Sequence, residues 1–260
     1  MNPLAVGLII GLIQGILEWL PVSSQGNLVV FMTSLLGVDP GQALRLSVFL
    51  HVGTGLAALL YFRRDFTEIL LRKSETGRVL FRFLFIATAV TGIIGLPIYL
   101  FAREVSLLGE SLLILTGVAL IVTGLIQRGA RESRVRGVDA IRDVEASLLG
   151  FAQGLSALPG LSRSGLTLSV LLMRGFSGEA ALRISFLISV PAVFAAAFGL
   201  AFIEGVSTFE PSFLVALVAS FTSAYVTIDG LIRLARRVRF WGICIALGLI
   251  ALLPQIASWL

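Results

Sequence analysis

The residues that could do chemistry gather in two short clusters of an otherwise apolar chain. The first cluster, residues 11–27, holds one carboxylate and two hydroxyls, and the second, residues 150–167, holds an arginine among hydroxyls. Ionisable side chains are costly at membrane depth, so they mark functional sites there. A gapless shift of 139 positions superposes Gly11 on Gly150, Gln14 on Gln153, Gly15 on Gly154, Ser23 on Ser162 and Gly26 on Gly165. This duplication indicates an internal repeat that assembles one site from two halves.

The second cluster is suited to an oxyanion. Arg163 carries a permanent charge on a planar fork of donors that matches phosphate oxygens. Ser162, Ser164 and Thr167 place hydroxyls around it, and Gly165 allows close approach of the backbone. If a helix begins near Ser164, its N-terminal amides point at the same anion. We therefore expect this cluster to bind phosphate.

The first cluster could supply the reacting groups. Glu18 is a candidate base or metal ligand, and Ser23 and Ser24 are candidate nucleophiles or phosphate donors. Gln14 precedes Glu18 by four residues, so both side chains share one helix face. A Gln/Glu pair at that spacing can share one hard cation through its oxygens.

Structural interpretations compete with these roles. Glycine and hydroxyl residues commonly pack membrane helices, Glu18 could be a protonated carboxyl satisfied by a neighbour, and Arg163 could be its buried counter-ion. Their joint occurrence in both clusters favours a site, because buried ionisable groups gather at sites. His51 has no Cys or carboxylate at ligand spacing and is interpreted as a packing histidine. Asp229 is expected to pair with Arg233 at i,i+4.

The composition is that of an integral membrane protein. Of the 260 residues, 57% are hydrophobic and 13% are charged, and the charged fraction is about half that of soluble domains. Apolar runs of about 20 residues favour helices over a barrel. We expect one all-α membrane domain over residues 1–260, in which six helices cross the bilayer at about 46–62, 79–101, 107–127, 183–203, 212–232 and 240–260.

Two further stretches are too short to cross and are expected to form re-entrant helix–turn–helix hairpins. One pairs residues 3–20 with 28–38, and the other pairs 144–158 with 166–173. Such broken segments are tolerated where they are buried in protein or line a wet cavity.

Charge predicts the orientation of the chain. Arginines concentrate in the loops 63–82, 128–142 and 233–239, which places these loops in the cytoplasm. These arginines account for the net charge of +5, so the basic charge is interpreted as a signal of membrane orientation and not of nucleic-acid binding. Each half, about 1–127 and 144–260, then holds one hairpin and three crossings, so the second half is inverted. The two turns would meet near the midplane, with both termini outside.

The motifs Gln14–Glu18, Leu20–Ser24 and Pro159–Thr167 resemble the signature motifs of the undecaprenyl-diphosphate phosphatase family of the bacitracin-resistance type. The resemblance covers essentially the whole chain. It implies six crossings, two re-entrant hairpins and hydrolysis of a polyprenyl diphosphate to the monophosphate carrier lipid and inorganic phosphate. It also implies stimulation by a divalent cation such as Mg or Ca, a role in recycling the carrier lipid for cell-wall biogenesis, and a site that opens outward from the cell membrane.

The resemblance also assigns residues. Glu18 matches the family's second acidic position, Ser24 the serine implicated in catalysis, and Arg163 the phosphate-binding arginine. Asn27 is a departure, because the family usually has a histidine there. Asparagine can bond a phosphate but can neither be a phosphorylated nucleophile nor titrate near neutrality.

The sequence therefore predicts a polyprenyl-diphosphate phosphatase acting on a lipid substrate among membrane lipids; a homodimer is compatible with it. The alternative is a transporter or flippase for an anionic lipid or small anion, since facing broken helices are a transporter architecture. The predicted catalytic residues are Glu18, Ser24 and Arg163, the predicted phosphate-binding residues are Ser23, Asn27, Ser162, Arg163, Ser164, Gly165 and Thr167, and the predicted metal ligands are Glu18 and Gln14.

Overall fold

The computed structural model describes residues 2–72, 74–106, 111–129, 136–204, 211–235 and 241–257. Within these ranges the chain forms helices and no strand, which confirms the expected all-α class. The helices are α1 (Pro3–Leu17), α2 (Ser24–Leu36), α3 (Pro40–Tyr61), α4 (Arg63–Leu71), α5 (Glu75–Ser106), α6 (Ser111–Gly129), the 3₁₀ turn η1 (Val138–Ala140), α7 (Asp143–Leu155), α8 (Arg163–Met173), α9 (Gly178–Glu204), α10 (Pro211–Ala235) and α11 (Trp241–Ala257).

Five of the described helices are long and apolar enough to cross a membrane, namely α3, α5, α6, α9 and α10. Each contains most of one predicted crossing. α3 begins before the predicted residue 46, because Asp39 caps it and accepts a hydrogen bond from the Gln42 amide at 3.0 Å. α11 covers most of the sixth predicted crossing but has only 17 residues.

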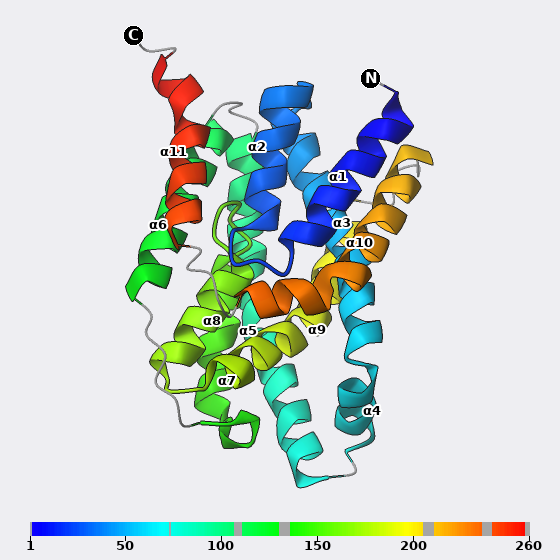
Figure 1. Cartoon of the computed structure of the whole chain (residues 1–260), viewed down its shortest axis with the longest axis vertical. Coiled ribbons are helices and arrows are strands. Elements are labelled where there is room, and N and C mark those ends of the chain that lie inside the picture. Colours follow the sequence, from blue (N-terminus) through cyan, green and yellow to red (C-terminus); the bar gives the residue numbers. More distant parts are fainter. Residues whose placement is uncertain are drawn as a thin grey trace.

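The two expected hairpins are formed by α1 with α2 and by α7 with α8, and Figure 1 shows them approaching the middle of the molecule from opposite ends. Their second arms begin earlier than predicted, at Ser24 and Arg163. The reason is capping. The Ser23 hydroxyl accepts from the Gly26 amide at 3.3 Å, and the Ser162 hydroxyl accepts from the Gly165 amide at 3.1 Å.

The two turns pack directly on each other. A Cβ on Gly26 would lie 2.6 Å from the Gly160 nitrogen, so no larger side chain fits there. Gly160 has φ +97°, a conformation that glycine adopts without strain. The close approach of the turns needs Gly26, whereas a Cβ on Gly160 would lie 2.3 Å from the Thr116 carbonyl oxygen of α6. The approach brings the polar residues of both clusters together.

Each hairpin packs against a helix from the other half of the chain. α1 lies along α10, and α7 lies along α5. Trp19, just after α1, is buried, donates its indole N–H to the Ala224 carbonyl at 3.1 Å and makes an edge contact with Phe186 at 5.3 Å between ring centroids. These contacts of Trp19 fix the position of the first turn relative to α10 and α9.

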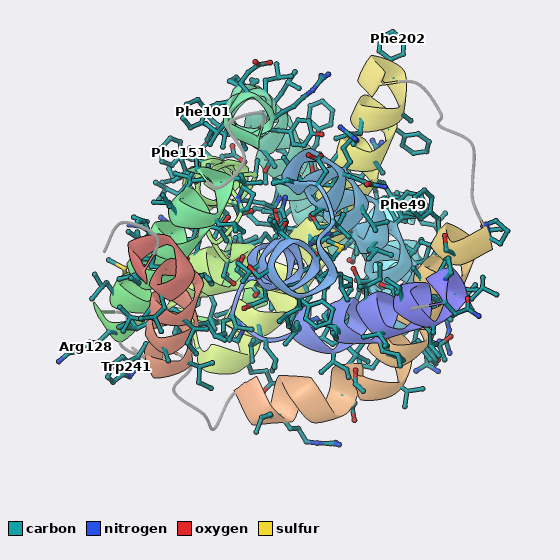
Figure 2. All side chains as sticks on the ribbon, turned by 90° about the horizontal axis from the view of Figure 1, so that it is seen from above. Phe49, Phe101, Arg128, Phe151, Phe202 and Trp241 are labelled. Atoms are coloured by element: carbon teal, nitrogen blue, oxygen red, sulfur yellow. The ribbon has the colours of Figure 1, made fainter. Side chains whose placement is uncertain are left out.

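The outer surface of the bundle is apolar, as a lipid-facing surface requires. Phe101, Phe151 and Phe202 point away from the bundle in Figure 2, and Phe202 is 92% exposed. At the rim Arg128 lies over the Trp241 ring, 5.1 Å from its centroid.

The charged end of the molecule is held by ion pairs. Arg136 and Arg174 both contact the buried Glu145 carboxylate at 2.9 Å. The predicted pair of Asp229 and Arg233 is confirmed at 2.9 Å. Several basic residues on which the orientation was predicted lie outside the described residues: Lys73, Arg131, Arg134, Arg236, Arg237 and Arg239.

Candidate active site

Glu18 lies at the centre of the site. It ends α1 as the C-cap residue, and its side chain is buried. One carboxylate oxygen forms an ion pair with the Arg163 guanidinium. The other accepts hydrogen bonds from the Gln14 amide and the Ser24 hydroxyl, each at 2.9 Å. The ion pair joins the two hairpins through residues that are far apart in sequence.

Arg163 opens α8 and lies at the wall of a cavity. Besides Glu18, its guanidinium donates to the Ser185 carbonyl at 3.4 Å. A guanidinium has five N–H donors, so these two contacts leave capacity for another anion. The pairing expected of a buried counter-ion is present, and it is compatible with phosphate binding by the same side chain.

Ser24 is the first residue of α2 and is buried against Glu18. Its hydroxyl lies 2.9 Å from a Glu18 oxygen, within reach for proton transfer. A serine paired with a base at this distance is the arrangement of an activated nucleophile.

His51 belongs to this site, which corrects its interpretation as a packing histidine. Its Nε2 lies 3.3 Å from the Glu18 carboxylate and 3.5 Å from the Ser24 hydroxyl, and its Nδ1 lies 2.7 Å from the Ser47 carbonyl oxygen. Sequence spacing concealed the contact, because α3 carries His51 while its partners lie on α1 and α2. The available signal was an ionisable side chain inside an apolar crossing.

These side chains face a cavity of about 440 Å³. Its polar end is lined by Glu18, Ser23, Ser24, His51, Ser162, Arg163 and Ser164. The cavity continues between α5 and α9, where small residues such as Gly92, Gly95, Ala192, Ala195, Ala196 and Gly199 line it together with larger apolar side chains and the hydroxyls of Thr88, Thr91 and Ser189. One cavity with a charged end and a long apolar end suits a molecule with an anionic head and a hydrocarbon tail.

Several predicted site residues hold the turns instead of lining the cavity. The Asn27 amide donates to the Val22 carbonyl at 2.6 Å and the Ser23 carbonyl at 2.9 Å. Thr167 is buried, with its hydroxyl 2.6 Å from that of Ser185. Among the described residues, Asn27, Gly165, Thr167 and Gln14 are absent from the cavity lining.

Carbonyl groups of the first turn are held from three other elements. Ser164 donates to the Leu20 carbonyl at 3.1 Å. The Pro21 carbonyl accepts from Gln127 of α6 at 2.5 Å and from Cys244 of α11 at 3.2 Å. Proximity in sequence gave no signal for Gln127 or Cys244, since more than 100 residues separate each from Pro21.

The predicted metal ligands do not form a ligand set for a divalent cation. Both Glu18 oxygens already have partners, and one partner is the cationic Arg163. The Oε1 atom of Gln14 is buried without a partner, which leaves a single neutral oxygen. Over the described ranges, no group of three or more His, Cys, Asp or Glu side chains could hold a metal ion.

Comparison with known proteins supplies the family. A model of the family described as bacitracin resistance protein BacA matches residues 7–250. The chain belongs to this family.

The relatives of this BacA-family chain include proteins named undecaprenyl-diphosphatase. That of Haloarcula marismortui is 42% identical over 258 residues, covering 95% of this chain and 96% of the relative. That of Methanothrix thermoacetophila is 44% identical over 255 residues, covering 96% and 97%. That of Methanococcoides burtonii is 39% identical over 266 residues, covering 98% and 99%. Together with the five long apolar helices, membership of this family makes the chain a multi-pass integral membrane protein.

Proposed function

We propose that this protein hydrolyses a polyprenyl diphosphate of the undecaprenyl type to the monophosphate carrier lipid and inorganic phosphate. The observation that carries the proposal is the set Ser24, Glu18 and Arg163 at the polar end of a cavity whose other end is apolar. The names of the relatives support the same activity over the transport alternative.

The chemistry follows from the roles of these three side chains. Ser24 attacks the terminal phosphorus while Glu18 takes its proton; the new Oγ–P bond forms as the bond to the bridging oxygen breaks, and the lipid monophosphate leaves. Water then hydrolyses the phosphoserine and restores the hydroxyl. In the alternative route Glu18 activates water, which attacks the phosphorus directly. In both routes Arg163 stabilises the charge on the transferring phosphoryl group, where most of the catalysis of this reaction lies.

Three serine side chains near Arg163 and Glu18 would contact the diphosphate. Ser164, Ser162 and Ser23 line its polar end, and their hydroxyls lie at the N-termini of α8 and α2, where helix amides favour anions. Asn27, Gly165 and Thr167 lie behind them, and their direct phosphate contacts stay predictions. The hydrocarbon tail would lie between α5 and α9 and continue into lipid.

The topology that we propose has six crossings, with α11 as the sixth, and two re-entrant hairpins. The exchange of partners, α1 on α10 and α7 on α5, supports an inverted repeat of about 1–127 and 144–260 within one membrane domain. α1 begins and α11 ends at the same end of the molecule in Figure 1, which is compatible with both termini outside. On this orientation the site opens outward.

The divalent cation and the homodimer stay predictions. Because Glu18 has no vacant oxygen, no step of the proposed chemistry passes through a metal held by the protein.

Phosphate release from a purified polyprenyl diphosphate tests the proposal directly. We expect the wild type in detergent to release one phosphate per lipid and to leave the monophosphate, and Glu18→Gln to release none. Binding or movement of the lipid across vesicles without phosphate release would support the transporter in its place.

A further inference from the structure

The only histidine of the chain lies at the proposed active site, beside the Glu18 carboxylate. We propose that His51 is a positioning residue that holds the Glu18 carboxylate against Ser24 while Arg163 engages the substrate phosphate. This inference rests on the proposed function and adds a residue to it.

The orientation of the His51 ring is fixed by a hydrogen bond within α3. The Nδ1 atom lies 2.7 Å from the Ser47 carbonyl oxygen, which can only accept, so Nδ1 carries a proton. Ser47 lies one helical turn before His51 on α3, so this bond fixes the ring relative to its own helix. Nε2 is thereby held toward α1 and α2.

The Nε2 atom of His51 faces the Glu18 carboxylate. It lies 3.3 Å from the same Glu18 oxygen that accepts from Ser24 at 2.9 Å. A carboxylate oxygen also only accepts, so the contact is favourable when Nε2 donates. With a proton on Nδ1 as well, the ring is then the imidazolium cation, which forms an ion pair with the buried carboxylate. His51 therefore holds the oxygen that is assigned to take the proton of Ser24.

The Glu18 carboxylate and the substrate phosphate compete for the Arg163 guanidinium. In the structure Arg163 binds the other Glu18 oxygen. A substrate phosphate carries more charge than a carboxylate and also fits the guanidinium fork, so binding weakens the hold of Arg163 on Glu18. The buried Glu18 then needs a second partner that the substrate does not displace, and His51 supplies it from α3.

Two amide substitutions separate this role from a purely structural one. The amide nitrogen of Gln comes closest to Nε2 and that of Asn closest to Nδ1. His51→Gln keeps a donor toward Glu18, whereas His51→Asn keeps only the donor toward Ser47. His51→Ala removes both, and Thr54→Val is the matched control. Thr54 is buried on the same helix and donates to the His51 carbonyl, but it is outside the cavity lining.

The measurement is kcat and KM for phosphate release, with detergent size-exclusion and thermal unfolding as checks of folding. We expect kcat to fall about 10- to 100-fold in His51→Asn and His51→Ala, the range for a lost hydrogen bond to a charged group. His51→Gln should stay within about fivefold of the wild type, KM should change little in all three, and Thr54→Val should match the wild type.

The opposite ranking of kcat for the Gln and Asn variants would contradict the proposal. If well-folded His51→Asn is as active as His51→Gln or more so, the functional contact of the ring is the hydrogen bond to Ser47 within α3 and not the contact with Glu18. Wild-type kcat in His51→Ala overturns the proposal as well. If His51→Ala does not fold, the comparison of the Gln and Asn variants still decides. A wild type that releases no phosphate overturns the proposed function and this inference together, whereas an active wild type with unaffected His51 variants overturns this inference alone.

Discussion

Replacing Arg163 by lysine tests the fork geometry while keeping the charge. The Arg163 guanidinium spans two partners, the Glu18 carboxylate and the Ser185 carbonyl, and still has donors for a phosphate. Lysine is a point charge on a flexible stem and cannot bind two oxygens side by side in the same way. The loss of one charge-assisted hydrogen bond costs about 1.5–3 kcal/mol, which corresponds to roughly a 10- to 150-fold fall in kcat/KM.

The assay is phosphate release by Arg163→Lys in detergent, with kcat/KM compared with that of the wild type. A matched control is Arg174→Lys, which makes the same change at the buried Glu145 carboxylate, at a residue that is not among those lining the cavity. We expect the control to keep its kcat/KM and to lose only stability. Turnover within about twofold of the wild type in well-folded Arg163→Lys would refute the binding of two phosphate oxygens side by side by the guanidinium.

Three further outcomes are expected. Glu18→Gln should abolish hydrolysis but leave binding of the lipid diphosphate largely intact in equilibrium binding, and retained turnover would reduce Glu18 to a structural residue. Asn27→Ala should slow phosphate release moderately and lower the melting temperature, because hydrogen bonds worth about 1–3 kcal/mol to two turn carbonyls are lost. Asn27→His should be tolerated. Complete inactivity of a folded Asn27→Ala would reveal a chemical role of the amide. Burial raises the pKa of the Glu145 carboxyl, but hydrogen bonds from Arg174 and Arg136 outweigh it, so the pKa lies below the usual 4.5. The stabilisation that Glu145 provides should therefore be complete above that value and be lost as the pH falls through the lowered pKa, and melting curves of Glu145→Gln should lack this acid-dependent loss.

The sequence was sufficient for the helices and for the two broken segments, because both signals are local. Apolar runs define the crossing helices, and a polar turn with glycine and serine interrupts the short ones. Boundaries were less accurate, since a capping side chain and not the end of an apolar run starts a helix. Ser23 and Ser162 start α2 and α8 before the apolar residues begin.

The partners of the site residues depended on tertiary structure. The pairing of Glu18 with Ser24 is nearly local, and the repeat indicated that Arg163 comes close. His51 and Gln127 approach the first turn from helices that no spacing rule connects to it. Asn27 was assigned to phosphate from its place in a motif, whereas its amide closes the turn.

On the proposed function, the repeat explains why one site can hold both a nucleophile and a cation. Two positions that begin the second arm of each hairpin are the same in both halves: Ser23 and Ser162 cap a helix, and Gly26 and Gly165 follow at the same offset of 139. Positions to which we assign the chemistry differ at that offset, where Ser24 corresponds to Arg163 and Glu18 to Ala157.

Two identical turns that faced each other would place like groups together, two arginines or two carboxylates, and such pairs repel in a buried site. Divergence at these two positions places Ser24 and Glu18 opposite Arg163 instead. A chain in which Ser24 and Arg163 exchange identities should therefore fold but carry its cation on the wrong hairpin, away from Ser185. It should release no phosphate, and full activity of that exchanged chain would show that the position of the guanidinium between the hairpins does not matter.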